Sequence, residues 1–204
     1  MPIPAHLFYS TVIRPGLSAL ESHPRLERQL ALNLGNSPKS SAMLLAIALQ
    51  ESGLQHRLQV SSSTGQEMQH LARGWWQCEP ISCRLLLSNP ATTWLPKVMA
   101  DYGLRGTAAV LHDLVRDVDM LAVWAARGLL WCLPQPLPLP LFEQRELAWS
   151  QYLAAWNPGK ARPEKWPENW RVAVRVVREA YAMAPDPSLS GPARPMPGGS
   201  EPQV

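Results

Sequence analysis

Residues 37–53 read S-P-K-S-S-A-M-L-L-A-I-A-L-Q-E-S-G, and this stretch decides the fold. Ser37 is a good cap for a helix that opens with Pro38, because its hydroxyl can accept a backbone N–H and proline needs no N–H in the first turn. Gly53 is a good stop, since glycine readily takes the left-handed conformation that ends many helices. The segment between them is apolar nearly all round, which predicts a helix through the middle of a hydrophobic core.

The composition is that of a globular protein of one domain. The 204 residues are 46% hydrophobic and 17% charged, which fits a sizeable core and argues against disorder throughout the chain. A net charge of +3 without a dense basic stripe does not indicate nucleic-acid binding. The three cysteines, Cys78, Cys83 and Cys132, cannot all pair with one another, so we expect reduced thiols.

Apolar residues at helical spacing recur along most of the chain. They predict further helices over residues 17–34, 92–102, 106–115, 117–131, 143–155 and 168–183, with a polar stretch over residues 59–73 that holds a loop at residues 61–65. The stretch L-P-Q-P-L-P-L-P at 133–140 cannot be helical and is interpreted as a rigid extended connector, with an SH3-type ligand as the alternative. The fold is therefore predicted to be mainly α, with one helical domain over residues 1–183 and a disordered Pro-, Gly- and Ser-rich tail over residues 184–204.

The position of Glu51 is the main chemical signal. Leu44, Ile47, Ala48 and Glu51 follow the spacing of one helix face, so the carboxyl lies in line with buried apolar side chains at the C-terminal end of the helix. Desolvation and the negative end of the helix dipole both raise the pKa of a carboxyl. A glutamic acid that stays protonated near neutral pH can protonate a glycosidic oxygen. The alternative is a Glu51 that frays into solvent beside Gly53.

Three short motifs follow one another along the chain. They are A-L-Q-E-S-G at 48–53, A-R-G-W-W-Q at 72–77 and Y-L-A-A-W-N-P-G at 152–159. In this order they resemble the Glu-Ser, Gly-Leu-Met-Gln and Ala-Tyr-Asn-Ala-Gly motifs of the soluble lytic transglycosylase and goose-type lysozyme family. The resemblance covers residues 37–159 and implies a lysozyme-like helical fold, in which a core helix carries the catalytic glutamate and a groove binds the glycan strands of peptidoglycan.

By matching position, the resemblance implies one catalytic acid and a set of substrate-contacting residues. Glu51 is the acid, and the groove is lined by Ser52, Gly74, Trp75, Trp76, Gln77, Trp156 and Asn157. Gly74 can let the backbone approach a ligand closely, and the Gln77 amide offers both a donor and an acceptor. Trp156 stands in place of the family's tyrosine, and an indole N–H donates but cannot accept, so the contact to Glu51 is expected to be altered.

A second carboxylate would distinguish between mechanisms, because most glycosidases use a pair. Glu79 lies two positions after Gln77 and can line the same groove, although a helix-opening residue beside Pro80 is the preferred interpretation. Without an obvious partner, Glu51 fits a lytic transglycosylase, in which one glutamate acts as acid and then as base while a substrate hydroxyl closes an anhydro ring. No cofactor is expected. A hydrolase that uses Glu79 is the alternative mechanism.

Two alternative interpretations are a metal site and a protein without catalytic activity. A metal site built from Cys78, Cys83, His70 and His112 has poor zinc-ligand spacing, so none is expected. The rival from another class is a catalytically inactive structural or cell-wall-binding protein of a virion that keeps the groove without turnover.

The ends and the apolar runs bear on location. Residues 1–6 lack a basic patch followed by an apolar run, and the longest apolar stretch, 118–133, carries Asp119 and Arg127, so neither a signal peptide nor a membrane span is expected. The hypothesis that follows is a phage-encoded enzyme, made in the host cytoplasm and then carried in a virion or released to the cell wall. Its expected partners are peptidoglycan strands and other virion proteins.

Overall fold

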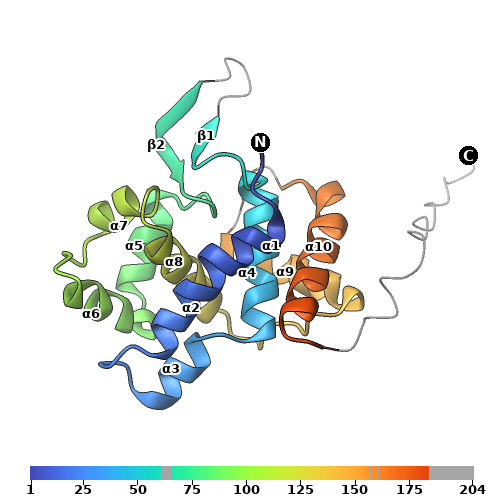
Figure 1. The fold of residues 1–204 in the computed structure, drawn as a ribbon. Helices are drawn as coiled ribbons and strands as arrows, with labels where there is room; N and C mark the ends of the chain where they lie inside the picture. Colours follow the sequence, from blue (N-terminus) through green and yellow to red (C-terminus); the bar gives the residue numbers. More distant parts are fainter. Residues whose placement is uncertain (61–65, 157, 160, 184–204) are drawn as a thin grey trace, which may run out of the picture.

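The computed structural model describes residues 1–60, 66–156, 158–159 and 161–183. Most of these residues are helical and pack around one hydrophobic core, with a β-hairpin at one end (Figure 1), so the mainly-α prediction is confirmed. The elements in chain order are α1 (Ala5–Phe8), η1 (Tyr9–Ile13), α2 (Arg14–Glu21), α3 (Arg28–Leu34), α4 (Pro38–Ser52), β1 (Leu58–Val60), β2 (Glu67–Arg73), α5 (Pro80–Ser88), η2 (Pro90–Thr92), α6 (Trp94–Asp101), α7 (Ala108–Leu114), α8 (Asp119–Trp131), η3 (Phe142–Gln144), α9 (Arg145–Trp156), η4 (Pro163–Lys165) and α10 (Trp166–Ala180).

Helix α4 is the predicted central helix, and both of its ends are confirmed. Ser37 caps it and forms a reciprocal capping box with Ser40, while Gly53 ends it in the left-handed conformation with φ of 58°. Every residue from Ser40 to Ala48 is fully buried. The helix is therefore enclosed as far as Ala48, and Glu51 lies in the partly exposed last turn beyond it.

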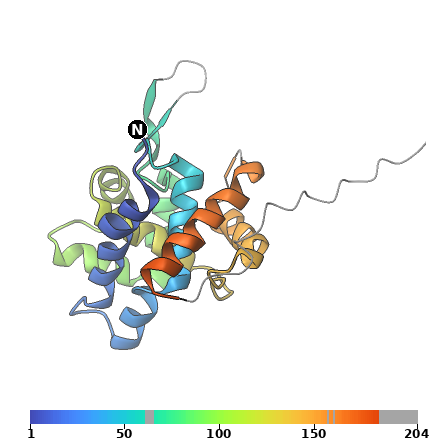
Figure 2. The same cartoon turned by 45° about the vertical axis from the view of Figure 1, so that its right-hand side comes forward.

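Two helices enclose α4. Helix α10 lies beside it in both views (Figures 1 and 2) and buries Trp170, Ala173, Val174 and Val177. Helix α8 packs against α4 and also against α2, where the Trp124 indole N–H donates to the carbonyl oxygen of Gly16 at 2.9 Å. The indole therefore pairs its only polar group inside the core.

The helix predicted over residues 17–34 is wrong as a continuous element. The chain forms α2 and α3 instead, with residues 22–27 between them. Pro24 lies in this gap, and it cannot supply the N–H that a continuous helix needs. The helical run also begins earlier than predicted, at Ala5, and widens to a π-helical turn at Tyr9–Ile13 just before Pro15, another residue without an N–H.

The polar stretch over residues 59–73 forms two strands where the structure describes it, and these strands were not predicted. Strands β1 and β2 pair antiparallel, with Leu58 opposite Arg73 and Gln59 opposite Met68, and a register shift between Leu58 and Gln59. Residues 61–65 lie outside the described part. The hairpin stands away from the helices (Figure 1), so its strands do not need the apolar alternation by which strands are found in a sequence.

The stretch 133–140 is not helical, as predicted, and it is fastened to two helices. Gln151 on α9 donates its side-chain N–H to the Pro136 carbonyl oxygen at 2.8 Å, and Arg178 on α10 donates to that of Pro140 at 3.2 Å. These bonds support the rigid-connector interpretation. The predicted tail over residues 184–204 lies outside the described residues.

Two further predictions concern membrane spans and disulfide bonds. Within the described ranges, the helices are either too short or too polar to cross a bilayer. The three cysteines are free, and the sulfur atoms of Cys78 and Cys83 lie 3.4 Å apart in the core.

Candidate active site

A pocket of about 800 Å³ opens at the C-terminal end of α4. Its wall is built from three separate parts of the chain, which are the end of α4 with the base of the hairpin, the turn that leads into α5, and the end of α9 with the segment that follows it. The residues that line it include Gln50, Glu51, Ser52, Gln77, Glu79, Tyr152, Trp156, Arg162 and Lys165. The pocket has the size of a site that holds a small ligand or a short stretch of polymer.

Glu51 lies in this pocket and is partly buried, so it does not fray into open solvent. The pKa of its carboxyl is raised from 4.5 to about 7, chiefly because the group is buried, and the negative charge of Glu79 acts in the same direction. A hydrogen bond from Tyr152 and the positive charge of Arg162 act in the opposite direction. Near neutral pH the carboxyl is therefore divided between its acid and base forms, as proton transfer in both directions requires.

Tyr152 is the direct partner of Glu51. Its hydroxyl donates to Oε1 of Glu51 at 2.7 Å, and its ring is 2% exposed. Trp166 stacks on that ring with centroids 5.2 Å apart and planes 14° from parallel. Burial and the neighbouring carboxylate raise the pKa of Tyr152 above its usual range, so the phenol keeps its proton and remains a donor.

The motif match assigned the tyrosine position to Trp156 and missed Tyr152. Both residues lie on α9, and Tyr152 precedes Trp156 by one helical turn, so they share one helix face. The Trp156 indole N–H donates to the carbonyl oxygen of Trp76 at 2.8 Å and not to Glu51. The i, i+4 spacing of two aromatic residues is the signal that could have identified Tyr152 from the sequence.

Gly74 lies in a tight turn. Arg73 and Cys78 pair through two backbone hydrogen bonds, and residues 74–77 form the turn between them, with φ of 74° at Gly74 and 47° at Gln77. Only Gln77 reaches the pocket. Gly74 instead packs against the carbonyl oxygen of Val115, where a Cβ atom would overlap, so its role is to allow close packing and not to approach a ligand.

Trp75 and Trp76 do not line the pocket, which corrects the expectation that they line the groove. Trp75 is 5% exposed and donates to Asp119, while Trp76 is 2% exposed and donates to the carbonyl oxygen of Leu44 at 2.8 Å. Both indoles lie in the core because the turn directs them inward. Their N–H groups are already paired within the protein.

The remaining predicted site residues have mixed outcomes. Ser52 lines the pocket, but its hydroxyl donates to the carbonyl oxygen of Ala48 and accepts the N–H of Leu54, so it closes the end of α4. Glu79 is the N-cap residue of α5 before Pro80, as predicted, and its exposed side chain also lines the pocket. Asn157 lies outside the described residues.

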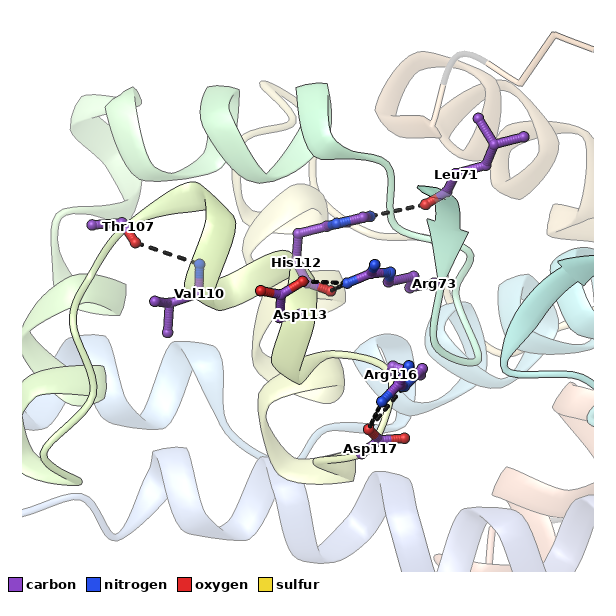
Figure 3. A network of polar contacts seen from close by, with 8 residues as sticks. All are labelled: Leu71, Arg73, Thr107, Val110, His112, Asp113, Arg116 and Asp117. Atoms are coloured by element: carbon purple, nitrogen blue, oxygen red, sulfur yellow. Dashed lines mark hydrogen bonds and ion pairs between the residues drawn. The ribbon is translucent and has the colours of Figure 1, made fainter. Parts of the chain in front are cut away.

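A polar network fixes the strand that leads into the turn (Figure 3). The His112 imidazole, on α7, donates through Nε2 to the carbonyl oxygen of Leu71 at 2.9 Å, and Arg73 pairs with Asp113. Burial lowers the pKa of His112, which keeps the ring neutral. His112 therefore has a structural role, and no three His, Cys, Asp or Glu side chains in the described part of the chain gather as a metal site would require.

Comparisons of the chain with protein-family models, with curated proteins and with solved structures find no match. The three motifs alone carry the family resemblance, and the geometry around Glu51 is independent of it.

Proposed function

We propose that this protein cleaves the glycosidic bond between N-acetylmuramic acid and N-acetylglucosamine in peptidoglycan, with Glu51 as the general acid. The observation that carries the proposal is the Glu51 carboxyl, which has a pKa of about 7 and receives the Tyr152 hydroxyl inside an open pocket. A structural glutamate gains nothing from this arrangement, because burial without a strong positive partner destabilises its ionised form.

The two carboxyl oxygens of Glu51 have separate tasks in this reaction. Tyr152 donates to Oε1, which leaves Oε2 to hold the proton and pass it to the glycosidic oxygen. As the bond from the sugar C1 to that oxygen breaks, the Tyr152 hydrogen bond stabilises the carboxylate that forms. In a lytic transglycosylase the carboxylate then removes a proton from the C6 hydroxyl of the muramyl residue, whose oxygen closes on C1. Glu51 regains its proton in this step, and no water is consumed.

Glu79 makes a hydrolase the second candidate. Its carboxylate lines the same pocket and is exposed, so it could orient a water molecule for attack on C1. The products distinguish the two mechanisms, because the transglycosylase leaves 1,6-anhydro-muramyl ends and the hydrolase leaves reducing ends.

The test is digestion of purified peptidoglycan by the wild-type protein and by Glu51→Gln, with soluble muropeptides measured by mass spectrometry. Loss of a general acid is expected to reduce release by about 100-fold or more. Glu143→Gln is the matched control, since Glu143 is exposed and does not line the pocket, and it should cleave as the wild type does.

A wild-type protein that pellets with peptidoglycan but releases nothing would refute cleavage. That result would favour the inactive wall-binding or virion structural protein. Detection of the protein by mass spectrometry in purified phage particles would support the virion hypothesis in either case.

A further inference from the structure

The charged side chains of the pocket come from three different parts of the chain. The carboxylates of Glu51 and Glu79 come from the end of α4 and the start of α5, whereas the cationic side chains of Arg162 and Lys165 come from the segment at η4. Both cations are exposed. Neither forms an ion pair with any residue that the structure describes, so both are available to a ligand.

The backbone that carries these cations is fixed. The carbonyl oxygen of Arg162 accepts the Gln50 side-chain N–H at 3.0 Å and the Lys165 backbone N–H at 3.1 Å. Gln50 is 7% exposed, and its side-chain carbonyl oxygen accepts the side-chain N–H of Asn169 at 2.8 Å. The residue after Lys165 is the buried Trp166, whose indole donates to the carbonyl oxygen of Arg145 at 2.9 Å. Because the backbone is already fixed, only the two side chains lose conformational entropy when they bind an anion.

We propose that Arg162 and Lys165 form a subsite that binds a carboxylate of the substrate, in the same pocket as Glu51. This inference rests on the proposed cleavage of peptidoglycan. A guanidinium binds carboxylates with two parallel hydrogen bonds, and an ammonium adds a second positive charge. Peptidoglycan offers carboxylates from two sources, the peptide stem where one is attached and the lactyl group of a muramyl residue whose stem has been removed, whereas polymers of N-acetylglucosamine alone offer none. The pair therefore selects acid-bearing glycan over neutral glycan.

A bound carboxylate would also act on Glu51. The positive charge of Arg162 lowers the pKa of Glu51, and a substrate anion would neutralise that charge. Binding of the right polymer thus favours the protonated acid that begins the reaction. The falling limb of the pH profile should lie at higher pH for kcat, which reports the bound enzyme, than for kcat/KM, which reports the free enzyme.

The test uses binding in a Glu51→Gln background, so that no ligand is consumed. Three ligands are compared, an N-acetylglucosamine oligomer, glycan strands stripped of peptides by an amidase, and strands with their stems. Arg162→Ala and Lys165→Ala are each expected to weaken binding of the carboxylate-bearing strands about fivefold to tenfold, with a smaller effect at high salt. Binding of the neutral oligomer should change less than about twofold by the same electrostatic argument. Weaker binding of the stripped strands identifies the lactyl carboxylate as the ligand group. Weaker binding of only the strands with stems identifies a carboxylate of the stem.

Two controls separate charge at this site from charge in general. Arg162→Lys keeps the cation and should restore most of the affinity. Arg105→Ala removes one positive charge from an exposed residue outside the pocket and should change no affinity. Equal losses of affinity for the neutral oligomer and the carboxylate-bearing strands, or no loss of affinity for either, would overturn the subsite. The cleavage proposal is tested separately by the digestion assay. If the wild-type protein cleaves nothing, yet the variants bind only the carboxylate-bearing strands more weakly, the proposed reaction fails and the subsite is supported.

Discussion

Removal of the Glu51 carboxyl is expected to make the protein more stable at high pH while it abolishes cleavage. Burial raises the pKa of Glu51 from 4.5 to about 7, so the folded protein holds this proton more tightly than the unfolded chain does. The free energy of unfolding therefore falls as the pH rises from about 4.5 to about 7, and it levels off above that range. Gln in this position is neutral at every pH and can still accept the Tyr152 hydrogen bond.

The size of the effect follows from the two pKa values. Each tenfold change in proton affinity corresponds to about 1.4 kcal/mol, so the full rise from 4.5 to about 7 is worth about 3 kcal/mol. About 1 kcal/mol of this difference is already present at about pH 5, because the unfolded chain is then partly ionised. The stability gained by Glu51→Gln should consequently grow by about 2.5 kcal/mol between about pH 5 and about pH 8.

Urea unfolding followed by tryptophan fluorescence measures this difference at the two pH values. Glu143→Gln makes the same chemical change at an exposed position and should track the wild type. A Glu51→Gln variant whose gain in stability is the same at both pH values would show that Glu51 titrates alike in the folded and unfolded states. That result would contradict a Glu51 carboxyl that keeps its proton near neutral pH.

Two further predictions concern the partners of Glu51 and the turn beside it. Tyr152→Phe removes a hydrogen bond that lowers the pKa of Glu51, so the falling limb of the kcat/KM profile should move to higher pH and the maximal rate should drop about tenfold. A drop in rate without a shift of that limb would contradict the contact. Gly74→Ala places a Cβ against the carbonyl oxygen of Val115 at a φ of 74°, so urea unfolding should show a loss of about 2 kcal/mol or more. Unchanged stability would refute the described turn.

The parts of the fold that depend on local signals could be predicted from the sequence. Ser37 and Gly53 bound α4 because capping is a matter of a few adjacent residues, and Glu51 could be singled out because its spacing from Leu44 and Ile47 defines one helix face. The division of residues 17–34 into two helices could also have been predicted, since Pro24 is a visible break.

The rest depends on packing between distant segments. Nothing within A-R-G-W-W-Q shows that both indoles face inward, because that is decided by Leu44 and Asp119, which accept their N–H groups. Tyr152 was missed because its role is defined by a contact with a residue 101 positions earlier. The hairpin was missed because its polar strands carry no alternating apolar face.

The backbone of Trp76 joins the parts of the pocket in a way that bears on how the protein is made. Its side chain is anchored to α4, and its carbonyl oxygen receives the indole of Trp156 from α9. A ribosome that has produced only residues 1–131 has produced the acid, but neither the phenol that steadies it nor the two cations beside it. Under the proposed function, an incomplete or prematurely terminated product is thus expected to cleave nothing, because the pocket around Glu51 is complete only after α9 and η4 have packed.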